Sequence, residues 1–272
     1  MLKIIQVTDI HFLPAGERRF DICPIERFDA FVDQVNSEHD DAALVVITGD
    51  IADYGDEESY HIFKKSLARL RLPVQLLIGN HDNRENFASV FPDTLRDQNG
   101  YIQSYRDIDG YRLIFTDTVQ PASIPDKMHH GFYDKARLDW LADTLEDAPE
   151  NRTLIFSHHN PMQVQWAPMD QLMINDTDAA ALGTLFDRYR GTIRHLFYGH
   201  GHRVIAGNWH GVSYSTMRGT MIGTDFRFDG EMVCHDKIEE PQYGLIFVDD
   251  ETVTHHIHDY MNAGPIIKKD AY

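Results

Sequence analysis

The sequence predicts an α/β fold, because short apolar segments alternate with amphipathic helical segments over the first three quarters of the chain. The apolar segments are rich in Val, Ile, Leu and Phe, as strands buried on both faces of a sheet are. Beyond His202 the helical pattern stops, and short strands separated by tight turns follow. This change predicts that mostly antiparallel strands are added to the sheet by the C-terminal part.

Each predicted element rests on its own pattern. The strands of the α/β part are Leu2–Val7, Ala43–Thr48, Val74–Ile78, Arg112–Thr116, Thr153–Ser157 and Arg194–Tyr198. The helices between them carry one apolar face each, at Phe28–Val35, Glu57–Leu67, Leu138–Leu145 and Asp176–Arg188. Asp56 and Asp134 precede two of these helices, where a carboxylate caps free backbone N–H groups. The later strands are Val204–Trp209, Val212–Thr216, Leu245–Val248 and Val253–Ile257.

The pattern suggests a division of the 272 residues into three parts. Residues 1–218 form the core. Residues 219–244 are polar and irregular, and we expect a cap or an interface insertion there. Residues 245–272 contain strands that return to the core and then a loose tail.

Composition excludes several classes of partner. The formal net charge of −18 repels polyanions, so long nucleic acids are poor partners, and an anionic substrate needs a local positive site such as bound divalent cations. No apolar run reaches the ~20 residues that span a bilayer. A cleaved leader would remove Asp9 and His11, so Met1–Thr8 is interpreted as a core strand and the protein as cytoplasmic. Cys23 and Cys234 make no disulfide framework, although one pair remains possible.

Five short motifs of metal-ligand residues follow predicted strands. They are Asp9-Ile10-His11, Gly49-Asp50, Gly79-Asn80-His81-Asp82, His158-His159 and Gly199-His200-Gly201-His202. Open α/β sheets place their ligands at the carboxyl ends of strands, so five loops at one edge can converge on one point. The sequence therefore predicts a polar site at that edge.

The residue types of these motifs suit two divalent cations. Carboxylate, imidazole and amide oxygen bind Mn, Zn, Fe or Co, and one carboxylate can bridge two ions. A pair of ions ~3.5–4 Å apart can clamp the attacking and leaving oxygens of a phosphoryl transfer, and a water bound between them becomes a hydroxide nucleophile near neutral pH. Such a site needs no nucleophilic side chain.

The order of the motifs over residues 9–202 resembles that of the calcineurin-like metallophosphoesterase superfamily. The resemblance implies a four-layer αββα sandwich with a small C-terminal cap or oligomerisation extension. It also implies a first metal held by Asp9, His11, Asp50 and His202, and a second held by Asp50, Asn80, His158 and His200. His81 would face the phosphate as the catalytic side chain, and Asp82 would orient His81.

Within the superfamily, the chain is similar to bacterial glycerophosphodiesterases and class III cyclic nucleotide phosphodiesterases. The His158-His159 pair and the segment Met169–Leu172 carry this similarity, whereas Asn160 stands where relatives usually have proline. Relatives of this subgroup often oligomerise through the C-terminal half, so a homo-oligomer is expected.

These observations predict a dinuclear metal-dependent phosphodiesterase for small anionic phosphodiesters. Glycerophosphodiesters are the first expected substrate class and 3′,5′-cyclic nucleotides the second; a phosphomonoesterase, a nuclease or a non-catalytic scaffold are the alternatives. The role of His159 stays open, and Asp53 is placed either to bond a ligand or to cap a turn. The His129-His130 pair and residues 255–258 are interpreted as a solvated or interface surface.

Overall fold

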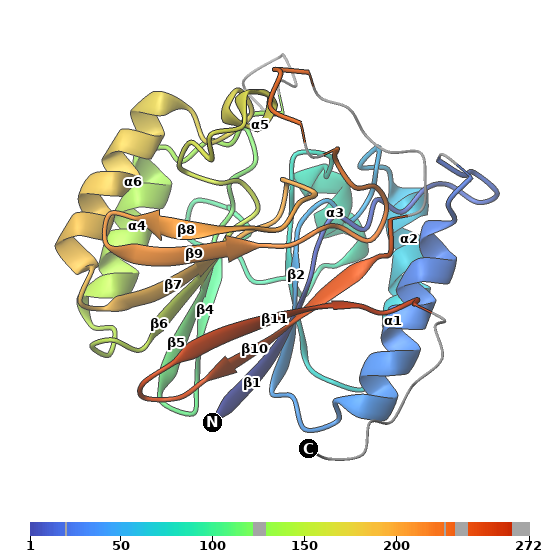
Figure 1. Cartoon of the computed structure of the whole chain (residues 1–272), viewed down its shortest axis with the longest axis horizontal. Coiled ribbons are helices and arrows are strands. Elements are labelled where there is room, and N and C mark those ends of the chain that lie inside the picture. Colours follow the sequence, from blue (N-terminus) through green and yellow to red (C-terminus); the bar gives the residue numbers. More distant parts are fainter. Residues whose placement is uncertain (20, 122–128, 226, 232–238, 263–272) are drawn as a thin grey trace.

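The structure, a computed structural model of the chain, describes residues 1–19, 21–121, 129–225, 227–231 and 239–262. Two mixed β-sheets face each other, and helices cover the outer face of each sheet (Figure 1). The predicted α/β class and the αββα sandwich are confirmed. Within the described residues, none of the helices has the length and apolar character that crossing a bilayer requires.

The first sheet has the strand order β11-β10-β1-β2-β3. Strands β1, β2 and β3 are parallel, and β10 pairs antiparallel with both β1 and β11. The strands are β1 (Leu2–Val7), β2 (Leu44–Thr48), β3 (Val74–Leu77), β10 (Gln242–Val248) and β11 (Val253–Asp259). The C-terminal strands therefore complete the sheet that the N-terminal strand begins.

The second sheet has the order β4-β5-β6-β7-β9-β8. Strands β5, β6, β7 and β9 are parallel, whereas β4 and β8 run antiparallel to their neighbours at the two edges. The strands are β4 (Ser104–Ile108), β5 (Tyr111–Phe115), β6 (Thr153–Phe156), β7 (Ile193–Phe197), β8 (Ile205–Trp209) and β9 (Val212–Thr216).

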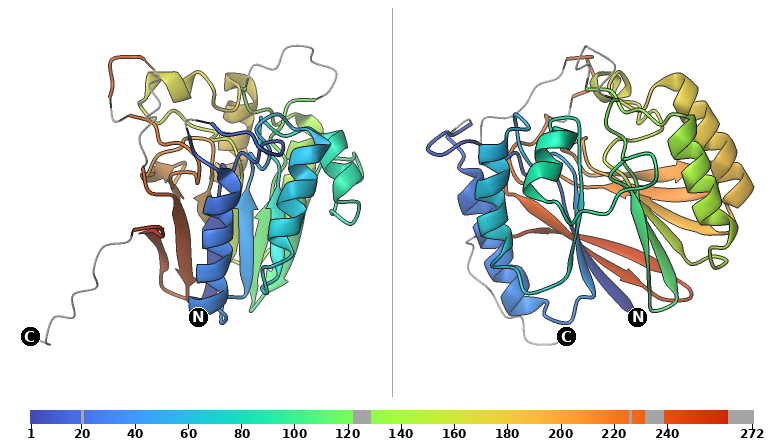
Figure 2. Two further views of the ribbon diagram at one scale, coloured as in Figure 1. Left: turned by 90° about the vertical axis from the view of Figure 1, so that its right-hand side faces the viewer. Right: turned by 180° about the vertical axis from the view of Figure 1, so that it is seen from behind.

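Helices form the two outer layers. Those on the first sheet are α1 (Pro24–Glu38), α2 (Glu57–Leu67) and α3 (Arg84–Val90), and those on the second are α4 (Lys135–Glu146) and α6 (Asp176–Tyr189). Figure 2 shows the two helical layers on opposite sides of the paired sheets. The predicted caps are confirmed, because the Asp56 and Asp134 carboxylates accept hydrogen bonds from the backbone N–H of Ser59 and Arg137.

Three elements were not predicted from the sequence. They are α3, the half-exposed strand β4 and the four-residue helix α5 (Ala167–Asp170). The segment expected to act as a cap, 219–244, is described only in part, and Cys234 and the tail 263–272 lie outside the described residues. The first part of that segment packs on the core, because the Arg27 guanidinium donates to the carbonyls of Thr220 and Met221.

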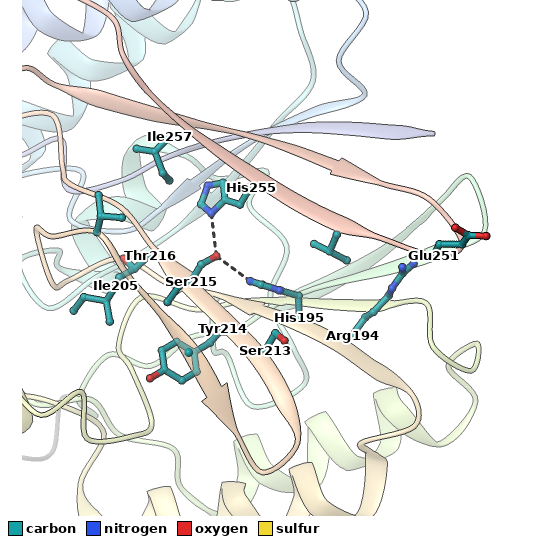
Figure 3. A pocket seen from close by; sticks show the side chains of 14 residues that line it. Arg194, His195, Ile205, Ser213, Tyr214, Ser215, Thr216, Glu251, His255 and Ile257 are labelled. Atoms are coloured by element: carbon teal, nitrogen blue, oxygen red, sulfur yellow. Dashed lines mark hydrogen bonds between the residues drawn. The ribbon is translucent and has the colours of Figure 1, made fainter.

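Apolar side chains fill most of the space between the sheets, but one polar cluster lies at its edge (Figure 3). His195 on β7 and His255 on β11 each lie 2.9 Å from the Ser215 hydroxyl on β9. A cavity of about 520 Å³ adjoins the cluster. Burial lowers the pKa of His195 to about 3 and that of His255 to about 4, so two neutral rings from opposite sheets share one hydroxyl. The interpretation of residues 255–258 as a solvated or interface surface is therefore wrong for His255, whereas His256 and His258 are exposed on β11 as expected.

Candidate metal centre

The five predicted motifs converge at the carboxyl ends of strands from both sheets. Asp9 and His11 follow β1, Asp50 follows β2, and Asn80 follows β3. On the second sheet, His158 follows β6, and His200 and His202 follow β7. The structure thus brings together side chains that lie up to 193 positions apart in the sequence, the separation of Asp9 and His202.

A first group of four side chains could hold one cation. The ligand atoms of Asp9, His11, Asp50 and His202 all lie within 4.8 Å of one another. His202 Nε2 lies 3.2 Å from Asp9 Oδ1 and 3.3 Å from His11 Nε2, and His11 Nε2 lies 3.8 Å from Asp50 Oδ2. All four residues are buried. Their composition matches the ligand set expected for the first metal.

A second group lies on the other side of Asp50. His158 Nε2 is 3.4 Å from Asp50 Oδ2 and 3.0 Å from Asn80 Oδ1. The ring of His200 lies 5.1 Å from that of His158, centroid to centroid. One Asp50 oxygen therefore lies near an imidazole of each group, which is the position that a bridging carboxylate needs.

The backbone at these positions is unusual. Asp9, His11, Asp50, His200 and His202 all adopt the left-handed region, with φ between 46° and 65°. Residues with a Cβ seldom adopt this conformation, and it concentrates at functional sites. The adjacent glycines are required for close packing: a Cβ on Gly79 would lie 2.3 Å from Asp50 Oδ1, and one on Gly199 would lie 2.2 Å from the Thr8 hydroxyl.

Hydrogen bonds on the far side of each ring orient the imidazoles. The Nδ1–H groups of His158 and His202 donate to the carbonyls of Thr48 and Ile222, both at 2.8 Å. His200 uses the opposite nitrogen, because its Nε2–H donates to the Leu172 carbonyl at 3.2 Å. The remaining ring nitrogens face the centre, as they do in metal sites where an outer acceptor fixes the tautomer.

The contact between His11 and His202 also suits a cation. The two Nε2 atoms lie 3.3 Å apart, close enough for one cation to bind both once His202 has lost the proton that it shares with Asp9. The donor set of imidazole, carboxylate and amide oxygen suits a divalent first-row metal. The residues present therefore fit the expected pair of cations.

Electrostatics in the metal-free centre follow from these contacts. Burial opposes ionisation of the Asp9 carboxyl, but His202 beside it brings the pKa of Asp9 down to about 2. Burial likewise opposes protonation of His158, but the Asp50 charge brings the pKa of His158 up to about 9. Protonated imidazoles thus balance the carboxylates without metal, so a binding cation has to displace protons.

Comparison with known proteins places this centre in a family. The calcineurin-like phosphoesterase family model matches residues 2–204. The chain belongs to the calcineurin-like phosphoesterases. Buried His and Asp clusters of this kind are typical of the dinuclear centre of that superfamily.

Two relatives and one solved structure show which proteins this phosphoesterase is similar to. A protein of Rhodopseudomonas palustris named a probable cyclic nucleotide phosphodiesterase is 35% identical, over 97% of this chain and 95% of its own length. One of Arcobacter nitrofigilis named a probable glycerophosphodiester phosphodiesterase is 28% identical, over 84% and 82%. A purple acid phosphatase from yellow lupin has the same fold, with a TM-score of 0.67 at 11% identity over 97% of this chain and 52% of its own.

In this phosphoesterase, His81 lies beside the two groups at the mouth of the centre, with 24% of its side chain exposed. Its backbone N–H donates to Asp50 Oδ1 at 2.9 Å, and its Nδ1–H donates to the Asp53 carbonyl at 2.8 Å.

The prediction that Asp82 orients His81 is wrong. The Asp82 carboxylate accepts hydrogen bonds from the backbone N–H groups of Ile51, Ala52 and Gly79. The Tyr60 hydroxyl also donates to it, at 2.8 Å. Asp82 therefore joins the loop after β2 to the loop after β3, and His81 is held by Asp53 instead.

The structure gives His159 contacts on both sides of its ring. Both ring nitrogens have partners, the Thr118 hydroxyl at 2.7 Å and the His129 carbonyl at 3.2 Å. These bonds tie His159 to a neighbouring loop, and one of its ring nitrogens also lies within 4.8 Å of those of His158 and His200. His129, interpreted as a surface residue, lies at the mouth of the centre, because its Nδ1 is 2.7 Å from Asn80 Nδ2. Sequence spacing carries no sign of this contact, which depends on the path of the loop.

Proposed function

We propose that this protein hydrolyses 3′,5′-cyclic nucleotides at a two-metal centre. The convergence of seven candidate ligand side chains at one sheet edge carries the proposed activity. Outer hydrogen bonds orient four of their imidazoles, those of His158, His200 and His202 to backbone carbonyls and that of His11 to the Asp53 carboxylate. The substrate class is supported by the relative named a probable cyclic nucleotide phosphodiesterase, which matches nearly the whole length of both chains.

This proposal reverses the order of substrates expected from the sequence. Glycerophosphodiesters, the first expectation, now come second, because the relative named for them is less similar and covers less of the chain. Phosphomonoesters and nucleic acids come last. The acidic net charge of −18 disfavours long nucleic acids in particular.

The proposed ligands of the first cation are Asp9, His11, Asp50 and His202, and those of the second are Asp50, Asn80, His158 and His200. Manganese, zinc, iron and cobalt all suit this donor set. When bound, the two cations activate a water molecule and neutralise charge on the phosphoryl oxygens.

The chain's own residues then position the reacting groups. The Asp53 carbonyl holds the Nδ1–H of His81, so the Nε2 atom can carry a proton to the leaving oxygen. The water oxygen forms the new bond to phosphorus and loses one proton to solvent, and one P–O ester bond breaks. The doubly protonated His81 ring gives its Nε2 proton to the released hydroxyl and regains a proton from solvent, so the proton count balances. A 3′,5′-cyclic nucleotide gives a nucleoside monophosphate in this reaction.

We also propose a domain organisation, an assembly state and a location. They are a core of residues 1–218 with a cap or interface insertion at 219–244, assembly as a homo-oligomer, and a cytoplasmic location. Light scattering of the purified protein tests the assembly, and it does so independently of catalysis.

The test of the proposed function is a comparison of substrates on chelator-treated protein, with and without added Mn²⁺ or Zn²⁺. The substrates are cyclic AMP, cyclic GMP, glycerophosphocholine, an aryl phosphodiester and its aryl phosphomonoester. We expect metal-dependent cleavage with the highest kcat/KM for a cyclic nucleotide. Asn80→Ala should lose turnover and bind metal weakly, whereas Asn208→Ala on the exposed edge strand β8 should behave as the wild type.

Each contrary result selects an alternative. Higher kcat/KM for glycerophosphocholine would restore the first expectation, and preferred cleavage of the monoester would make the protein a phosphomonoesterase. Inactivity with every substrate and metal would favour a non-catalytic scaffold. Full activity of Asn80→Ala would contradict the proposed ligand set.

A further inference from the structure

Asp53 contacts two functional imidazoles through different atoms. Its Oδ1 accepts a hydrogen bond from His11 Nδ1–H at 2.9 Å, and its backbone carbonyl accepts one from His81 Nδ1–H at 2.8 Å. The Asp53 side chain is 1% exposed, so water does not compete for these bonds. The rings of His11 and His81 lie 4.7 Å apart, almost perpendicular to each other, above this one residue.

The bond to His11 decides which of its ring nitrogens faces the centre. With its proton on Nδ1, His11 presents the lone pair of Nε2 toward Asp50 and His202. Without an acceptor at Nδ1, the proton can move to Nε2, and the ring can turn away from the centre. An acceptor behind a ligating imidazole typically changes metal affinity by 10–100-fold.

A positive charge holds the Asp53 carboxylate in this position. The Arg19 guanidinium pairs with the same Oδ1 atom that receives the His11 proton, and 38% of the Arg19 side chain is exposed. Arg19 thus lies between solvent and Asp53. No comparable carboxylate acts on His158, His200 or His202 within the described residues, because their outer partners are backbone carbonyls.

We propose that Asp53 is a positioning residue whose carboxylate fixes the tautomer and orientation of His11 for the first cation. The proposal rests on the two-metal centre of the proposed function but not on its substrate. Replacement of the Asp53 side chain therefore alters metal binding. The backbone carbonyl that accepts the His81 hydrogen bond is present in every variant.

The experiment titrates chelator-treated protein with Mn²⁺ alone and follows binding by calorimetry and electron paramagnetic resonance. Asp53→Ala and the volume-filling Asp53→Leu both remove the acceptor, and we expect ~10–100-fold weaker binding at one of the two sites. The other site should change by less than about threefold, because Asn80, His158 and His200 keep their contacts. Asp53→Asn keeps an acceptor oxygen and should fall between these variants and the wild type.

Asp56→Ala is the matched control. Asp56 lies three residues along in the same loop and caps α2 through the Ser59 N–H, so its loss lowers stability without touching an imidazole. We expect wild-type Mn²⁺ binding in this variant. If Asp53→Ala does not fold, the Mn²⁺ titration of Asp53→Leu is the test of the proposal.

Two results would overturn the proposal. One is wild-type affinity at both sites in a folded variant that lacks the acceptor. The other is an equal loss at both sites that Asp56→Ala reproduces, since that would make the role merely structural. Because Mn²⁺ binding needs no substrate, failure to cleave cyclic nucleotides would leave this test fully informative.

Discussion

Acid should weaken the contact between the two sheets through the cluster of His195, Ser215 and His255. In the folded protein the pKa values of the two histidines are about 3 and about 4, because both rings are buried. In the unfolded chain they return to about 6.5. Between these values the unfolded chain binds more protons than the folded one, so the free energy of unfolding decreases as the pH falls below about 6.5.

The size of the effect follows from these values. Lowering the pH from about 7.5 to about 5 stabilises one unfolded imidazole by about 2 kcal/mol, while the folded rings stay neutral. The pair therefore accounts for a loss of about 4 kcal/mol. His195→Gln and His255→Asn replace one titrating ring each with an amide near the nitrogen that contacts Ser215, and each should remove about 2 kcal/mol of the loss.

Urea unfolding of metal-free protein, followed by circular dichroism at both pH values, measures this difference. Histidines of the metal centre titrate in the wild type and the variants alike, so their contribution cancels in the comparison. If wild type and both variants lose the same free energy of unfolding on acidification, the reasoning about the cluster is wrong.

Three further predictions concern the metal centre. His81→Ala should bind Mn²⁺ as the wild type does but lose ~10²–10⁴-fold in kcat with an alkoxide leaving group. Calorimetry measures the binding and steady-state kinetics the turnover. Weaker Mn²⁺ binding would make His81 a metal ligand instead. Asp82→Ala should destabilise the metal-free protein by at least about 3 kcal/mol in urea unfolding, since it leaves three buried N–H groups without their acceptor. Chelation should lower the melting temperature, because saturation at 100 times the Kd contributes about 2.7 kcal/mol per site; a melting temperature that ignores both chelator and added metal would argue against the centre.

The sequence predicts most of the elements that position the site because their patterns are local. Helix α1 has apolar residues at helical spacing, and β1, β2 and β6 are continuous apolar runs that end at turn residues. The four-layer arrangement was expected only from the resemblance of the motif order to the calcineurin-like superfamily. Helix α3 was missed because only Phe87 and Val90 are buried in its seven residues, which is too short a pattern to separate from a loop.

The hydrogen-bond partner of His81 could not be predicted from the sequence, for a different reason. Asp82 is its neighbour in the chain and Asp53 is 28 positions away, so proximity favoured the wrong carboxylate. The loops after β2 and β3 pack tightly, and a Cβ on Gly55 would lie 2.8 Å from the His81 carbonyl. That tertiary packing turns Asp82 away and brings the Asp53 carbonyl to His81.

The left-handed backbone of Asp9, His11, Asp50, His200 and His202 lowers the free energy of unfolding at the residues that the reaction needs. Each such residue costs about 1–2 kcal/mol relative to a right-handed one, so the five together rival the ~5–15 kcal/mol that keeps a domain folded. Glycine would relieve this strain at every one of the positions and would remove a proposed metal ligand each time. Bound cations offset part of this strain, so the protein without its metals bears the cost of the left-handed residues uncompensated.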